Sequence, residues 1–332
     1  GALATIRIDV QRLDEPLVVG ERPVDAIFRE SIVRWDPAQE EVETLVDFSK
    51  FLSPDTTRVY RMPSYSIAAE CGQDQPSLDV ALWMHASSAA RSADGDVWVA
   101  SFVGLAAVAA FAADGASMKW IASCSTGLAS SPGLHVLAPE SEDACFGYPH
   151  SVVPINRTHV MLIDDGEMRA GSRCAAAPAG DAASDDPRVA FVHCYSRALM
   201  LKLDFERGTF GVAWQFAAGG AATSAADRAD PDAWPDDALY SVDGGSAVTL
   251  PNGNFLITFG NIRPSTGTRD RGVHSRVFEV SRAGDVHSVT HIPQSSISRL
   301  VGRRVPRPHL GRAVAAQLVV VKTFAKTLAA LL

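Results

Sequence analysis

The chain has 332 residues, of which 47% are hydrophobic and 20% are charged, so it can bury a sizeable core and is not a disordered protein. The formal net charge is −8, and seven of the 30 basic residues but none of the 38 acidic residues lie in residues 299–332. The acidic body therefore argues against a nucleic-acid-binding surface, whereas the basic tail alone could contact phosphate or a membrane surface.

Short apolar runs between Gly, Asp, Asn and Pro turns predict an all-β fold. Residues 5–10 alternate as a strand does, and residues 31–36 and 42–47 form an expected hairpin. Three later segments each predict four short strands: residues 80–123, 148–216 and 240–292. Repeated four-stranded antiparallel blades are typical of a β-propeller. We expect such a propeller over residues 1–298, incomplete at the amino end, and the chain either has lost a leader or starts inside a larger protein.

The end of the chain departs from this strand pattern. Residues 218–237 are small, polar and acidic and predict a long loop, and residues 299–332 form a basic and apolar tail. Within this tail, residues 313–332 have helical propensity with apolar residues nearly all round. Three interpretations stay open for the tail: a helix that packs on the protein, a helix on a membrane surface, and the product of a wrong reading frame. The apolar run of residues 97–111 is too short to span a bilayer.

The five cysteines include no CxxC pair, so a zinc ribbon or a thioredoxin-type motif has no support. Cys174 and Cys194 bracket an insertion rich in Ala, Gly and Asp, which a disulfide between them would staple. Two free buried thiols are the alternative. The glycosylation sequon at Asn156 is compatible with a secreted protein or a membrane-associated ectodomain.

Polar residues recur at one place in the repeated modules. The expected innermost strands, which would line the propeller channel, are residues 83–88, 148–153 and 243–248. The first two carry His85 and His150, and the third has Gly245 instead. A histidine in a strand is more often a core residue whose hydrogen bonds are made within the protein than a catalyst. Its recurrence in successive modules, however, favours a functional site. Further candidates on these strands, for substrate binding, are Ser87, Tyr148, Ser151 and Ser246.

Several motifs, in their order and spacing, resemble the arylsulfotransferase family, whose members are six-bladed β-propellers that transfer sulfuryl groups without phosphosulfate. The motifs are WMHASS, YPHSVV, a DDG hairpin, CYSRALMLKLDFE, VAWQF and DGGSAVTLPNGNFLITFG. The likeness extends from about residue 30 to about residue 298 and is strongest between residues 145 and 280.

The resemblance implies transfer of a sulfuryl group from a phenolic sulfate ester to a phenol through a sulfohistidine, without a nucleotide donor or other cofactor. By position, His85 and His150 match the family's funnel histidines, and Arg197 matches its sulfate-contacting arginine. Sulfuryl transfer resembles phosphoryl transfer, in which charge lies on equatorial oxygens, so His and Arg donors would stabilise the transition state.

The sequence also departs from the family pattern. The segment that should hold the nucleophilic histidine, residues 241–246, contains none. Ser151 stands where an Asp is expected and Ser87 or Ser88 where an Asn is expected, which weakens the orientation of both imidazoles. A binding module that keeps the propeller and has lost catalysis is therefore the second hypothesis. For Arg197 itself, the alternative to a sulfate contact is a solvated residue that opens a strand.

Metal sites have weaker support. His287 and His291 are four residues apart, but on a strand this spacing separates them along one face, so it does not favour a zinc pair. Asp164, Asp165 and Asp243 could line a calcium site, although DDG and DGG are also ordinary hairpin turns. We therefore expect no metal, and the family resemblance implies no cofactor and an aryl sulfate and a phenol as small-molecule partners.

Overall fold

The computed structural model describes most of the predicted strands. The described residues are 3–19, 22–36, 39–52, 64–66, 79–81, 83–124, 128, 135–166, 195–217, 240–241, 244–263 and 274–292. They form three β-sheets and two short 3-10 helices, so the prediction of an all-β fold is confirmed. The expected loop at 218–237 and the tail at 299–332 lie outside the described residues. No helix in the described ranges is long and apolar enough to cross a membrane.

The first sheet is built on a long antiparallel pair, β1 (Leu3–Val19) and β2 (Arg22–Asp36). The end of β2 also pairs with β3 (Glu41–Asp47), which confirms the hairpin predicted from the sequence. A parallel contact joins β2 to β5 (Asp79–Ala81), and β5 pairs with β4 (Ser64–Ser66). The 3-10 helix η1 (Phe48–Lys50) follows β3, and the buried side chain of Phe48 anchors it in the core.

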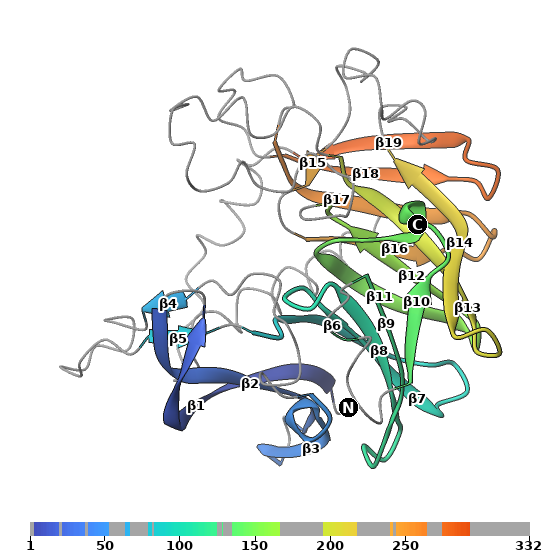
Figure 1. The fold of residues 1–332 in the computed structure, drawn as a ribbon. Helices are drawn as coiled ribbons and strands as arrows, with labels where there is room; N and C mark the ends of the chain where they lie inside the picture. The colour runs from blue at the N-terminus through green and yellow to red at the C-terminus, as the bar shows by residue number, and fades with distance from the viewer. Residues whose placement is uncertain are drawn as a thin grey trace.

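The second sheet contains two antiparallel meanders of four strands each (Figure 1). The first meander comprises β6 (Ala86–Arg91), β7 (Val97–Phe102), β8 (Ala107–Ala112) and β9 (Met118–Ser123). The second comprises β11 (Pro149–Asn156), β12 (His159–Asp164), β13 (Arg197–Asp204) and β14 (Thr209–Ala217). A short strand not expected from the sequence, β10 (Val136–Pro139), pairs in parallel with both β9 and β14 and joins the meanders.

The third sheet contains another four-stranded meander. Its strands are β16 (Gly245–Thr249), β17 (Phe255–Arg263), β18 (His274–Val280) and β19 (Val286–Ile292). The two-residue strand β15 (Tyr240–Ser241) pairs with the far end of β17. The three segments expected to hold four strands each therefore do so, with short additional strands at their borders.

The first sheet and the three meanders are stacked one on the next, and a hydrophobic cluster fills each of the three gaps (Figure 1). Alternate residues of β7 and β8 enter different clusters: Phe102 and Phe111 contact the side of β2 and η1, whereas Val99 and Val108 contact the side of β12 and β13. Both faces of a meander are therefore buried, which explains why its strands are continuous apolar runs without polar alternation.

The first strands of the meanders, β6, β11 and β16, are called the leading strands below. β11 contacts both β6 and β16. The leading strands are the segments expected to be innermost, although β6 starts at Ala86, three residues after the expected start at Trp83.

Candidate functional site

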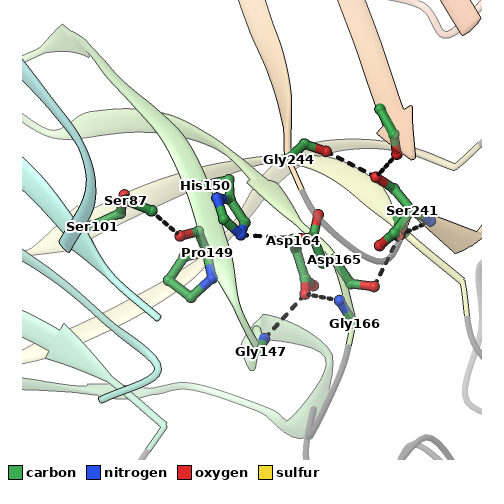
Figure 2. Close-up of polar contacts among 12 residues, drawn as sticks. Ser87, Ser101, Gly147, Pro149, His150, Asp164, Asp165, Gly166, Ser241 and Gly244 are labelled. Atoms are coloured by element: carbon green, nitrogen blue, oxygen red, sulfur yellow. Dashed lines mark hydrogen bonds and ion pairs between the residues drawn. The ribbon is translucent and has the colours of Figure 1, made fainter. Parts of the chain in front are cut away.

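The two predicted histidines lie at corresponding ends of adjacent leading strands. His85 immediately precedes β6, and His150 is the second residue of β11. The Ser87 hydroxyl donates a hydrogen bond to the Pro149 carbonyl over 2.8 Å, so the starts of β6 and β11 lie side by side (Figure 2). The structure therefore brings both histidine-bearing segments to the same end of the meanders.

The backbone of His85 is fixed on both sides. Its φ of 51° lies in the left-handed region, which costs a non-glycine residue roughly 1–3 kcal/mol. The His85 carbonyl accepts a hydrogen bond from the Val103 N–H over 2.9 Å, and the next N–H, of Ala86, donates to Glu30 over 2.9 Å. These two hydrogen bonds hold the strained residue in place at the start of β6.

His150 is held by a buried carboxylate. Its Nε2 lies 3.2 Å from Oδ2 of Asp165, and the side chain of His150 is 13% exposed whereas that of Asp165 is fully buried (Figure 2). Asp165 reaches this position because Pro149 pairs with Asp164 across the β11–β12 hairpin, which places the next residue beside the ring. A carboxylate at Nε2 favours the imidazole tautomer that carries its proton on that nitrogen.

The residues around His150 are also strained. Tyr148 has a φ of 53° and Ser151 a φ of 50°. The pairing of β11 with β12 shifts register between His150 and Val153, so Ser151 lies in a β-bulge. β6 has a similar register shift between Ala86 and Ser88. Bulges and left-handed residues are concentrated at functional sites because they redirect side chains.

Arg197, predicted to contact sulfate, is only 1% exposed, so the interpretation of a solvated residue is wrong. Its Nε lies 2.8 Å from Oδ2 of Asp164, Nη1 donates to Gln215 over 2.7 Å, and Nη2 donates to the Cys145 carbonyl over 2.6 Å. The other oxygen of Asp164 accepts hydrogen bonds from the backbone N–H groups of Gly147 and Gly166. Arg197 thus fixes the two loops that meet at His150.

The third leading strand has no room for a side chain at the corresponding position. Gly245 opens β16 with a φ of 153°, and a Cβ there would lie 2.6 Å from the Thr258 carbonyl oxygen and 3.2 Å from Ile163 Cγ2. Nearby, the buried Ser241 hydroxyl donates to the carbonyls of Gly244 and Gly260 (Figure 2). A histidine at position 245 is therefore excluded by the backbone as well as absent from the sequence.

The predicted substrate-binding residues occupy different environments. Ser87 lies at the bulge of β6, where its hydroxyl also contacts that of Ser101 over 2.8 Å. Tyr148 and Ser151 are half-buried and flank the two residues that begin β11. Ser246 is half-buried opposite Thr258 on β17. A role for these residues in substrate binding remains a prediction.

Comparison with protein families gives a match to the arylsulfotransferase (ASST) family over residues 22–230. The match covers well over half of the chain. This chain belongs to the arylsulfotransferase family. The resemblance inferred from the motifs is therefore confirmed. The matched range includes His85, His150, Asp165 and Arg197 but ends before β15, so the meander with Gly245 lies outside it.

No curated protein matches the chain. Among solved structures, it is similar to a mutant of the GH43 protein BlXynB from Bacillus licheniformis, with 9% identity, a TM-score of 0.34, and coverage of 93% of this chain and 45% of that chain. It is also similar to the periplasmic gluconolactonase PpgL from Pseudomonas aeruginosa, with 11% identity, a TM-score of 0.32, and coverage of 80% and 65%. The chain thus spans less than two thirds of either structure, and neither likeness carries a functional argument.

One ionisable residue beside this candidate site was missed by the sequence analysis. Glu30 on β2 is fully buried, and its Oε2 accepts the N–H of Ala86, next to His85. Burial raises the pKa of the Glu30 carboxyl to about 7, although the hydrogen bond from Ala86 favours the ionised form. The signal was present in the sequence, because Glu30 shares a strand face with Ile32, an apolar core residue.

Metal binding finds no support in the part of the chain that the structure describes, where no cluster of three or more His, Cys, Asp or Glu side chains could hold an ion. Asp164 instead binds Arg197 and two backbone N–H groups, and Asp165 lies against His150. His287 is exposed on β19. Asp243, the third residue of the possible calcium site, lies outside the described residues. The predicted disulfide partners Cys174 and Cys194 also lie outside them.

Proposed function

We propose that this chain is a β-propeller enzyme that transfers a sulfuryl group from an aryl sulfate ester to a phenol, with His150 as the residue that takes up the group. The observation that carries the proposal is the contact of His150 with the buried Asp165 in a chain of the arylsulfotransferase family. In this proposal the three meanders are successive blades of a propeller, and β6, β11 and β16 line its channel.

The first half of the reaction would form a sulfohistidine. Nε2 keeps its proton towards the carboxylate of Asp165, which stabilises the positive charge that the ring gains as Nδ1 attacks the sulfur of the ester. A nitrogen–sulfur bond forms, the sulfur–oxygen bond breaks, and the aryl oxide leaves with the bonding electron pair. In the second half, the oxygen of an acceptor phenol attacks the same sulfur and releases Nδ1.

His85 is the group we assign to proton transfer. It would protonate the departing aryl oxide and later take the proton of the acceptor phenol, so that each cycle returns it to its initial state. Its place supports this role, because the start of β6 lies against the start of β11 and the strained backbone of His85 is fixed by Val103 and Glu30. No nucleotide donor or other cofactor is needed in this scheme.

For Arg197 we infer a positioning role. The family resemblance predicts a contact with the sulfate group, but Nε, Nη1 and Nη2 each have a protein partner here. Through Asp164 it fixes Gly147 and Gly166, the residues on either side of the His150–Asp165 pair. Asp164 neutralises the charge of Arg197. In this scheme the positive charge that attracts the sulfate would come from the protonated imidazole of His85.

A binding module without catalysis is the second candidate, and Gly245 is the observation that favours it. The histidine expected in this region is absent, and the backbone at Gly245 leaves no space for one. The same surface would then bind an aryl sulfate or a related aromatic anion without turnover. Secretion and contact of the tail with a membrane surface stay predictions from the sequence.

The test is incubation of the full chain with 4-nitrophenyl sulfate and phenol, with release of 4-nitrophenol followed by absorbance and phenyl sulfate detected by mass spectrometry. We expect transfer that His150→Ala abolishes and Asp165→Asn reduces by up to about 10⁴-fold in kcat with little change in KM, because the ring loses its correct tautomer. His287→Ala, an exposed histidine on β19, is the matched control and should retain full activity.

Two outcomes would count against this proposal. Transfer that survives in His150→Ala would rule out the assigned nucleophile. A folded wild-type chain that binds the ester in calorimetry but produces no phenyl sulfate would favour the binding module.

A further inference from the structure

Three serine hydroxyls of the first meander form a connected chain that reaches into the second meander. Ser101 on β7 is fully buried, and its hydroxyl oxygen lies 2.8 Å from that of Ser87 and 2.6 Å from that of Ser88, both on β6. At one end of the chain, Ser87 donates to the Pro149 carbonyl over 2.8 Å (Figure 2). At the other end, Ser88 accepts the N–H of Val152 over 2.8 Å. This chain, called the serine circuit below, therefore connects two points of β11.

The bulge of β6 brings two consecutive serines to one partner. Successive residues of a regular strand point to opposite faces, so Ser87 and Ser88 could not both reach Ser101 from a regular strand. The pairing of β6 with β7 shifts register between Ala86 and Ser88, and Ser88 is paired with Ser101. In such a bulge, two residues oppose one residue of the partner strand, so both hydroxyls meet the hydroxyl of Ser101.

The direction of each hydrogen bond in the serine circuit follows from its end at β11. A carbonyl oxygen can only accept, so the single proton of the Ser87 hydroxyl is committed to Pro149. The bond between Ser87 and Ser101 therefore uses the proton of Ser101, and the bond between Ser101 and Ser88 uses that of Ser88. Each hydroxyl donates once and accepts once, and hydrogen bonds in such a chain polarise and strengthen one another.

The two ends of the serine circuit lie on either side of the residues that direct the imidazole of His150. Pro149 precedes His150, and Val152 follows Ser151, whose φ of 50° is left-handed. The register shift that follows His150 includes Val152, and the N–H of Val152 is bonded to Ser88. A strained backbone persists only where its surroundings hold it. The serine circuit supplies a hydrogen bond on both sides of this strained segment.

We propose that the serine circuit positions His150: it fixes the backbone on both sides of this residue and thereby holds the imidazole against Asp165. The inference deepens the proposed function and rests on it, because the ring that is held is the proposed nucleophile. With Nε2 directed at Asp165, Nδ1 is the nitrogen that faces the ester in the proposed transfer, and this direction depends on the backbone of β11. In this assignment Ser87 holds the backbone instead of the substrate, since its proton is used within the protein.

Four variants test the serine circuit. Ser101→Ala interrupts it at its centre, at a residue that bonds to neither Pro149 nor Val152. Ser88→Ala removes the acceptor of the Val152 N–H, whereas Ser88→Thr keeps a hydroxyl there. Ser92→Ala is the matched control, because the hydroxyl of Ser92 also accepts a backbone N–H and donates to another side chain, but at the opposite end of β6.

The first measurement is hydrogen exchange of the Val152 amide in the folded full chain, resolved by mass spectrometry with fragmentation. Ser101→Ala and Ser88→Ala should speed this exchange by about 5-fold, the effect of losing one typical hydrogen bond. Ser88→Thr and Ser92→Ala should match the wild type. Equal exchange in Ser101→Ala and the wild type would overturn the serine circuit.

The second measurement is transfer from 4-nitrophenyl sulfate to phenol. In Ser101→Ala, kcat should fall by about 10-fold to 100-fold with little change in KM, because a misdirected nucleophile loses rate and not ground-state binding. Ser88→Ala should behave in the same way, and Ser88→Thr and Ser92→Ala should keep the wild-type kcat. Wild-type kcat in Ser101→Ala, together with faster exchange at Val152, would show that the circuit does not position His150.

A third measurement separates this inference from the proposed function. In a chain labelled with ¹⁵N-histidine, the imidazole signals of His150, assigned by their loss in His150→Ala, report which nitrogen carries the proton. We expect the proton on Nε2 in the wild type and a mixture of both tautomers in Ser101→Ala. A wild-type chain without transfer would refute the sulfuryl transfer alone, whereas unchanged tautomers in Ser101→Ala would refute the positioning of His150.

Discussion

Glu30 makes the stability of the protein depend on pH in a predictable direction. Its carboxyl group has an ordinary pKa of 4.5 and a folded-state pKa of about 7, because it is fully buried and its Oε1 has no hydrogen-bond partner. Folding is therefore favoured when the group is protonated. The stability associated with the neutral acid is fully present below pH 4.5 and is lost as the pH rises through 7.

The size of the effect follows from the shift. Each pKa unit corresponds to about 1.4 kcal/mol, so a shift from 4.5 to about 7 gives a loss of about 3 kcal/mol in the free energy of unfolding. Glu30→Gln removes the titration and keeps an oxygen that can accept the Ala86 N–H. Its amide nitrogen adds a cost that does not vary between about pH 4 and pH 9. The prediction therefore concerns the slope with pH and not the absolute stability of the variant.

The assay is urea unfolding at pH 4.5, 6, 7 and 8.5, followed by tryptophan fluorescence. The wild-type chain should lose about 3 kcal/mol more than Glu30→Gln over this range. Glu43→Gln is the matched control, because Glu43 is exposed on β3 and should reproduce the wild-type slope. Parallel curves for the wild type and Glu30→Gln would refute the assignment of a neutral buried carboxyl at this position.

Two further predictions concern the backbone and charges of the site. Asp164→Leu or Arg197→Met alone should lower the free energy of unfolding in urea by about 3–5 kcal/mol, since each leaves a buried charge without its partner. The double variant should recover much of that loss, and additive losses would contradict the coupling of the two residues. Gly245→Ala should lower the free energy of unfolding by more than about 2 kcal/mol, because its Cβ would collide with the Thr258 carbonyl. Gly244 also has a positive φ but has open space around it, so Gly244→Ala should cost about 1 kcal/mol, and equal melting temperatures of the two variants would exclude the steric argument.

The fold was accessible from the sequence where local chemistry determines it. Apolar runs between DG and NG turns predicted the meanders, and burial on both faces explains why these runs lack polar alternation. β10 was not predicted because its four residues, Val136–Pro139, acquire their strand structure from two parallel partners that are distant in sequence. Residues 5–10 were recognised as a strand, but the long pairing of β1 with β2 was not predicted.

Sequence reasoning identified the two histidines of the site but not the acid that reaches His150 from elsewhere in the hairpin. His85 and His150 were found because they recur at one place in successive modules, a pattern visible in sequence. The orienting acid was sought at Ser151, the next residue in the chain, whereas the structure supplies Asp165 from the neighbouring strand. The hairpin register accounts for this residue, because Pro149 pairs with Asp164 and the N–H of Asp165 donates to the Tyr148 carbonyl, which brings Asp165 towards the ring of His150.

Backbone conformation at the three leading strands decides which of them can carry a histidine. His85, Tyr148 and Ser151 hold left-handed backbones that cost roughly 1–3 kcal/mol each, and the surrounding hydrogen bonds to Glu30, Asp164 and Asp165 offset that cost. At the third strand, the left-handed position is a glycine in contact with the Thr258 carbonyl, so a histidine there would require β16 to move away from β12 and β17. In the proposed transfer the nucleophile is therefore His150, the imidazole that has the buried carboxylate of Asp165 beside it.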